Sequence, residues 1–153
     1  MPLTAPPCTP AQIAIIADGG DGAFDGMSHS GTYLNMRNTG ARACRLPGLP
    51  PVRLLDRRGR ALPAVRRAPA GMHPGPVVMP VTIEAGACAQ LSLRWVSGPV
   101  FDRSRCLTPA RVAVTIGTGA SSVRLTARVC GPAGAPAAFE QTVLKPIADY
   151  PAE

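Results

Sequence analysis

The five cysteines are the residues of this chain whose chemistry is easiest to interpret. They are Cys8, Cys44, Cys88, Cys106 and Cys130. None of them forms a Cys-x-x-Cys pair, and the chain has only two histidines, which argues against a structural zinc site. Five cysteines in 153 residues indicate instead that disulfides form in an oxidising compartment. The odd number leaves one thiol that is unpaired or paired with another molecule.

The positions of the cysteines relative to the predicted strands suggest two disulfides. Cys8 and Cys44 flank the first two predicted strands, and Cys106 and Cys130 flank a later pair. We therefore predict the bridges Cys8–Cys44 and Cys106–Cys130, each stabilising the fold by roughly 3–4 kcal/mol through loop closure. Cys88 would then be the free thiol. Five cysteines allow other pairings, which the sequence alone leaves open.

A glycine-rich segment, Asp18-Gly-Gly-Asp21-Gly-Ala-Phe-Asp25-Gly, carries three carboxylates. Calcium prefers oxygen ligands that such turn-rich segments present. The spacing does not match an EF-hand loop, however, and Asp and Gly are also the residues that turns require. We favour a plain turn and keep calcium binding as a minor alternative.

Methionine and histidine stand close together twice, as Met27 and His29 and as Met72 and His73. A thioether and an imidazole together suit Cu(I). These four residues form the candidate metal site of our alternative hypothesis, in which the chain is a periplasmic copper-binding protein.

Arginine supplies nearly all of the positive charge, because the net charge is +7 and Lys145 is the only lysine. A cluster in the middle of the chain comprises Arg53, Arg57, Arg58, Arg60, Arg66 and Arg67. Arg57, Arg58 and Arg60 lie in one predicted turn and are our candidate anion-binding residues. The interpretation that we favour is a solvated turn, whose charges also protect an edge strand from aggregation. Nucleic acid is not an expected partner, because aromatic residues make up only 4% of the chain.

The sequence contains no pattern of a familiar catalytic site. It lacks the Gly-x-Ser-x-Gly elbow and any phosphate-binding glycine loop. Ser28, His29 and Ser30 are adjacent in sequence, but adjacency does not create a triad, and no partner acid is identifiable. Cys88 would need a neighbouring base to act as a nucleophile, and the sequence shows none. We expect no enzymatic activity and no cofactor.

Strands must position these residues. Glycine (16) and proline (18) are scattered along the chain, and no stretch keeps a helical periodicity. Apolar and polar residues alternate in short segments, around residues 13–17, 32–38, 52–56, 64–67, 79–83, 89–95, 112–116, 123–129 and 139–146. Met36 and Met79 fall at inward positions, and Trp95 belongs to the core. Eight or nine such strands, about 8–12 residues apart, predict one all-β domain, an antiparallel Ig-like β-sandwich.

The order of these features resembles a bacterial family of exported, Ig-like β-sandwich domains that is known only as a domain of unknown function. The shared features are Cys8, then Gly26, His29 and Ser30 before a Tyr-x-Leu strand, Asn38-Thr39-Gly40, Cys44-x-Leu46-x-Gly48-x-Pro50, the turns Asp56 to Gly59 and Thr82 to Gly86, the strand Leu91 to Trp95, Cys106 and Cys130. Cys88 departs from the family pattern, in which a small polar residue is usual. The resemblance, over about residues 8–147, implies the fold and export to the cell envelope, where members occur as lipoproteins or extracellular domains. It implies no activity.

We predict three parts of the chain: a disordered leader over residues 1–7, the sandwich over 8–147 and a flexible tail over 148–153. The first residues lack the basic start and apolar stretch of a signal peptide. We expect the mature part of an exported protein, periplasmic or at the cell surface, with Met1 added. No apolar run reaches the roughly 18 residues that span a bilayer.

The expected function is non-enzymatic binding to a protein or another component of the cell envelope. Sandwich domains bind in this way because a rigid core holds variable end loops. The loops at residues 18–30 and 69–76 are the longest candidates. The sequence leaves the ligand and the oligomeric state open.

Overall fold

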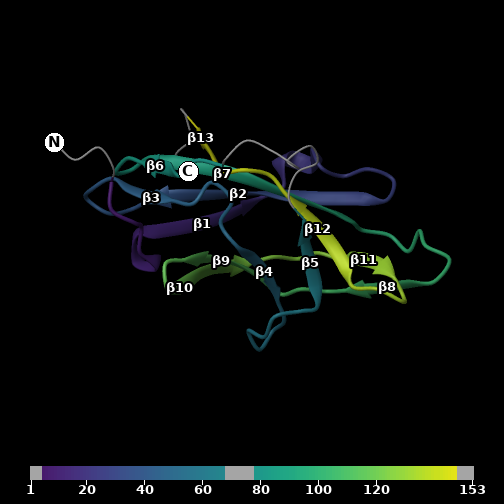
Figure 1. Cartoon of the computed structure of the whole chain (residues 1–153). Helices are drawn as coiled ribbons and strands as arrows, with labels where there is room; N and C mark the ends of the chain where they lie inside the picture. The colour runs from purple at the N-terminus through teal and green to yellow at the C-terminus, as the bar shows by residue number, and fades with distance from the viewer. Residues whose placement is uncertain (1–4, 68–77, 148–153) are drawn as a thin grey trace.

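The computed structural model describes residues 5–67 and 78–147, which form short strands and the 3-10 turns η1 (Pro10–Gln12) and η2 (Gly20–Gly22) (Figure 1). Among these strands only β2 and β7 are long, with 10 and 9 residues. The strands of the described residues are β1 (Ile13–Asp18), β2 (His29–Asn38), β3 (Cys44–Leu46), β4 (Val52–Leu55), β5 (Ala64–Arg67), β6 (Val81–Ile83), β7 (Cys88–Val96), β8 (Ser104–Leu107), β9 (Arg111–Ile116), β10 (Gly119–Arg124), β11 (Val129–Pro132), β12 (Ala137–Gln141) and β13 (Lys145–Ile147).

The strands form two layers. The large sheet has the order β1-β2-β7-β12-β5, with β13 also paired to β7, and the small sheet has the order β10-β9-β4. In Figure 1, β1, β2 and β7 of the large sheet lie above the small sheet, and β12 slopes down toward β5, which lies at the height of the small sheet. Two short two-stranded sheets, β3-β6 and β8-β11, lie at opposite ends of the molecule (Figure 1). The predicted all-β class with antiparallel sheets is confirmed. One pair differs, because β5 runs parallel to β12.

The core forms where the apolar faces of the two layers meet. Alternation along each strand sends every second side chain inward, as the sequence pattern predicted. The central side chains are at most 1% exposed: Leu34, Met36, Leu91 and Leu93 from the large sheet, and Val112, Val114 and Ile116 from the small sheet. Trp95 is also buried, at 5% exposure. The polar faces of the strands point outward.

Two predicted strands are each divided in the structure. The segment around residues 123–129 contains the end of β10 and the start of β11, because the backbone N–H of Leu125 donates to Ala110 and the chain then leaves the small sheet. The segment 139–146 contains β12 and β13, separated by a bend in which Leu144 turns into the core. Together with the unpredicted strands β3 and β8, these divisions raise the number of described strands to thirteen, above the predicted eight or nine.

Met79 is not the core residue that the alternation predicted. Its side chain is 69% exposed, and β6 begins only at Val81. Pro80 explains the difference, because proline has no N–H to donate to a neighbouring strand and so confines the strand to the residues after it.

The packed part of the chain begins before Cys8. The backbone N–H of Arg45 donates to the carbonyl of Pro6, and the Arg45 guanidinium donates to the carbonyl of Ala5 at 2.9 Å. Residues 5–7 of the predicted leader are therefore held against β3.

Candidate functional site

Both predicted disulfides are present, and they lie at the two ends of the molecule. Cys8 is bonded to Cys44 of β3, and Cys106 of β8 is bonded to Cys130 of β11. The second bridge joins residues that face each other directly across paired strands. Cys88 is a free and buried thiol, as predicted.

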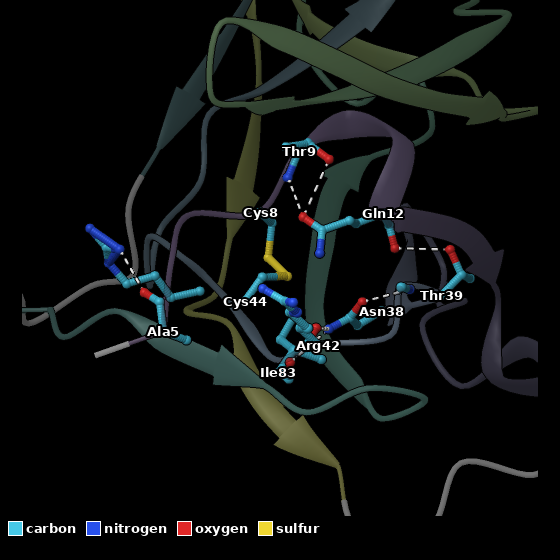
Figure 2. Close-up of a disulfide and its surroundings, with 11 residues drawn as sticks. Ala5, Cys8, Thr9, Gln12, Asn38, Thr39, Arg42, Cys44 and Ile83 are labelled. Atoms are coloured by element: carbon cyan, nitrogen blue, oxygen red, sulfur yellow. Dashed lines mark hydrogen bonds between the residues drawn. A yellow bond between two sulfur atoms is a disulfide. The ribbon is translucent and has the colours of Figure 1, made fainter. Parts of the chain in front are cut away.

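The end with the Cys8–Cys44 bridge is organised by one side chain, Asn38 (Figure 2). Its Nδ2 donates to the carbonyls of Arg42 and Ile83, at 2.8 and 2.9 Å. Its Oδ1 accepts the backbone N–H of Gly40. The fully buried amide thereby satisfies three backbone groups of the Asn-Thr-Gly turn and β6, which explains why this segment carries an asparagine.

Gln12 and Thr9 complete this end (Figure 2). The Gln12 Oε1 accepts the backbone N–H of Thr9, and the Gln12 carbonyl accepts both the backbone N–H and the hydroxyl of Thr39. The polar groups of this corner are thus used within the fold, and the corner is a structural element.

The three carboxylates of the candidate calcium loop do not form a metal site. Asp18 accepts the backbone N–H of Gly20, and Asp25 accepts the hydroxyl of Ser30. Throughout residues 5–67 and 78–147 no three His, Cys, Asp or Glu side chains gather so that they could hold a metal ion. The loop packs on its own sheet through Phe24, whose ring contacts Tyr33 edge-on with centroids 4.7 Å apart.

The candidate copper residues are not brought together by the described part of the chain. Met27 is fully exposed, and the imidazole of His29 is exposed beside the hydroxyl of Ser28. Met72 and His73, and the predicted loop at residues 69–76, lie outside the described residues.

The predicted arginine turn is exposed. Arg57, Arg58 and Arg60 follow β4, and the Asp56 carboxylate accepts the backbone N–H groups of Arg58 and Arg60. The pKa of Asp56 is held below its usual value, chiefly by the hydrogen bond from the backbone N–H of Arg60. The hydrogen bond from the backbone N–H of Arg58 and the positive charges of Arg60 and Arg58 also lower this pKa, whereas partial desolvation raises it. The guanidinium groups themselves have no hydrogen-bond partner within the described residues.

A cavity of about 410 Å³ lies near the other end of the molecule. This volume is within the range of small-molecule sites, roughly 300–1,000 Å³. The floor is the outer face of the large sheet, with His29, Arg67, Arg94, Val96, Ala138 and Glu140. The walls come from the loop before β8 and from β11 and its turn, including Phe101, Pro132 and Pro136. The core residue Trp95 of β7 also reaches the lining. We call this cavity the β7–β12 pocket.

The second disulfide and a glycine hold the wall of the β7–β12 pocket in place. Cys130 and Gly131 both line the pocket. A Cβ atom on Gly131 would lie 2.7 Å from the Cα of Ala137, so only glycine allows β11 to approach β12 this closely. The Cys106–Cys130 bridge then fixes β11 to β8.

Three charged side chains stand in one row on the pocket floor. Glu140 is in register with Arg67 of β5 on one side and with Arg94 of β7 on the other. All three are exposed, and none of them has a hydrogen bond or an ion pair within the described residues. Trp95 follows Arg94 on β7, so its side chain points to the opposite, core face, where its buried Nε1 has no hydrogen-bond partner within the described residues. Charged groups therefore converge on the pocket floor without being used by the fold.

The family follows from comparison with known domains. A family model described as domain of unknown function (DUF4232) matches residues 8–143. The chain belongs to this family. No curated protein and no solved structure matches the chain. The match includes both disulfides and the charged row, so the β7–β12 pocket is built within the DUF4232 domain.

The sequence did not identify the pocket of this DUF4232 domain. Arg67 belongs to the predicted arginine cluster, Arg94 and Glu140 fall within predicted strands, and Phe101 belongs to none of the predicted sites. The feature of the sequence that points to this pocket is a charged residue in each of two predicted strands, at positions 94 and 140. Sequence alone does not show that β12 lies between β5 and β7, and this order creates the row.

No helix within residues 5–67 and 78–147 is long and apolar enough to cross a membrane. The two disulfides of the DUF4232 domain are compatible with an exported protein, because such bonds persist in oxidising compartments.

Proposed function

We propose that this DUF4232 domain is an exported, non-enzymatic binding module of the bacterial cell envelope, and that the β7–β12 pocket is its binding site. The observation that carries the proposal is the convergence of Arg67, Glu140 and Arg94 on one cavity without internal partners. Charged side chains that the fold does not use are available to a ligand or a partner.

The composition of the pocket supports binding rather than catalysis. Its walls are apolar, through Phe101 and two prolines, and a few polar groups stand on the floor. This combination is typical of sites that hold a ligand by its shape and orient it by a few polar contacts. The sulfur of Cys130 in the wall is part of a disulfide, so it is not a nucleophile.

The proposal is tested by a search for ligands in a library that is balanced in charge. A library that contains equal numbers of anionic, cationic and neutral small molecules is screened by ¹⁵N–¹H NMR on the whole domain. We expect the hits to shift the backbone amide signals of Trp95, Gly131 and Ala138, whatever their charge. These groups belong to the pocket wall and floor.

A matched pair of variants provides the control. Ala138→Phe fills the pocket from its floor, whereas Ala120→Phe places the same ring on an exposed position of β10 in the small sheet. Ala138→Phe should abolish the shifts, and Ala120→Phe should preserve them. The proposal is wrong if no compound binds, if the shifts cluster elsewhere, or if both variants behave alike.

A further inference from the structure

The floor of the β7–β12 pocket presents its charges at a fixed spacing. Arg67, Glu140 and Arg94 occupy directly opposed positions on the neighbouring strands β5, β12 and β7. Neighbouring strands lie roughly 4.7–4.9 Å apart, and opposed side chains leave the sheet on the same face. Both guanidinium groups can therefore contact one small group above Glu140.

The row carries a net positive charge. Two guanidinium groups and one carboxylate sum to +1, and no ion pair within the described residues neutralises either arginine. A single carboxylate or phosphate group would balance this charge, and guanidinium binds both through paired N–H donors. A cationic ligand would be repelled by the two arginines.

The walls of the pocket favour an apolar body attached to that anion. Phe101 is 37% exposed at the rim, although it is a large apolar side chain, and Val100 next to it is 57% exposed. Pro132 and Pro136 continue the apolar surface along the wall. Covering such side chains is favourable in proportion to the apolar area removed from water.

We propose that the ligand of the β7–β12 pocket is an anionic amphiphile, in which a carboxylate or phosphate lies between Arg67 and Arg94 and an apolar chain lies along Phe101 and Pro132. This inference rests on the proposed binding function of the same pocket. Glu140 limits the affinity, because its carboxylate repels the anion of the ligand.

Trp95 makes the inference directly measurable, because it is the only tryptophan of the chain and adjoins the pocket between Arg94 and Val96 of the floor. The probes are four compounds with the same eight-carbon chain: octanoate, octyl phosphate, 1-octanol and octylamine. We expect saturable changes in tryptophan fluorescence with the two anions, roughly tenfold weaker binding of the alcohol and none of the amine. The better of the two anions identifies the head group.

Charge variants provide the second arm of the experiment. Arg94→Gln and Arg67→Gln should each weaken octanoate binding by about tenfold, and Glu140→Gln should strengthen it by about threefold or more. Arg53→Gln is the matched control, because Arg53 is an exposed arginine on β4 of the small sheet, outside the pocket. It should bind as the parent does. Circular dichroism confirms that each variant is folded.

The inference is overturned if neither anion binds, if 1-octanol binds as well as octanoate, or if the charge variants bind like the parent. A Glu140→Gln variant with weaker octanoate binding would also contradict it, because the carboxylate would then assist the ligand. The proposed function is tested separately by the NMR screen of the charge-balanced library. Neutral or cationic compounds that bind in the pocket would leave the binding function standing while removing the anionic ligand.

Discussion

The two disulfide-bonded ends of this domain use their polar side chains in opposite ways. At the Cys8–Cys44 end, Asn38, Gln12 and Arg45 all hydrogen-bond to backbone groups. Near the Cys106–Cys130 end, the charged side chains on the floor of the β7–β12 pocket have no partner in the described part of the chain. The same covalent device therefore supports a structural corner at one end and a candidate binding site at the other.

The difference teaches where to look for function in a β-sandwich. Buried polar groups need partners, because an unpaired one costs about 1–3 kcal/mol. Exposed charges have no such requirement, so their convergence over a cavity is not explained by folding. The first end should therefore respond to mutation in its stability and the second in its binding.

The largest effect is expected from removing the first disulfide. We predict that Cys8→Ala/Cys44→Ala lowers the free energy of unfolding by about 4 kcal/mol or more, from loop-closure entropy and from the loss of two buried sulfur atoms. Urea denaturation monitored by circular dichroism measures the change. Cys106→Ala/Cys130→Ala is the matched control, with a loop closure of similar size but a half-buried Cys106.

The control variant should lose at least about 1 kcal/mol less, because one of its two side chains is less buried. It should also weaken ligand binding, because Cys130 lines the β7–β12 pocket. Equal losses of stability and unchanged binding in both double variants would remove the distinction between the two ends.

A second prediction compares two buried asparagines of the same strand. Asn38→Ala should lower the free energy of unfolding by about 2–3 kcal/mol, since it leaves two carbonyls and one N–H without their partner. Asn35→Ala should cost less than about 1 kcal/mol, because Asn35 has a single side-chain bond, from Gln90, and its buried Nδ2 is unpaired. Thermal melts at one pH compare the two directly, and a larger loss at Asn35 would refute the assignment of Asn38 as the organising side chain.

The sequence predicted the fold where local pattern decides it. Alternation placed Leu34, Leu93, Val114 and Leu125 in the core, and all four are buried. The cysteines could be paired because each flanks a predicted strand. Prediction failed where a strand changes its partner, as at Leu125 and Leu144, because apolar alternation continues through a bend that tertiary hydrogen bonds create.

The candidate site was predicted less well, for a physical reason. The charged row requires that β12, near the end of the chain, lies between β5 and β7. Arg67, Arg94 and Glu140 are far apart in sequence, and each alone is an ordinary solvated residue of an outward strand face. The metal and anion candidates, by contrast, consist of residues close together in sequence, such as Asp18, Asp21 and Asp25.

A third prediction separates an arginine that the fold uses from one that it does not. Arg45→Gln should lower the free energy of unfolding by about 1 kcal/mol, because the guanidinium bond to the carbonyl of Ala5 is lost. Arg94→Gln should change it by less than about 0.5 kcal/mol, because its side chain is exposed and has no partner in the described residues. Urea titrations of both variants test this, and an Arg94→Gln variant as unstable as Arg45→Gln would mean that the charged row serves the fold.

The smallest effect is expected at Asp56, a carboxylate near the second disulfide that is bonded to the backbone of its own turn. Because the pKa of Asp56 is lowered in the folded state, ionised Asp56 stabilises the domain above the pKa of the unfolded chain, near 3.8. That contribution is lost as the pH falls through the lower folded value. Asp56→Asn keeps an oxygen acceptor for the turn but does not titrate, so its melting temperature should fall less than that of the parent between about pH 5 and pH 2. Melting curves across this range test the sign, and a variant that loses as much stability in acid as the parent would show that other carboxylates control the acid response.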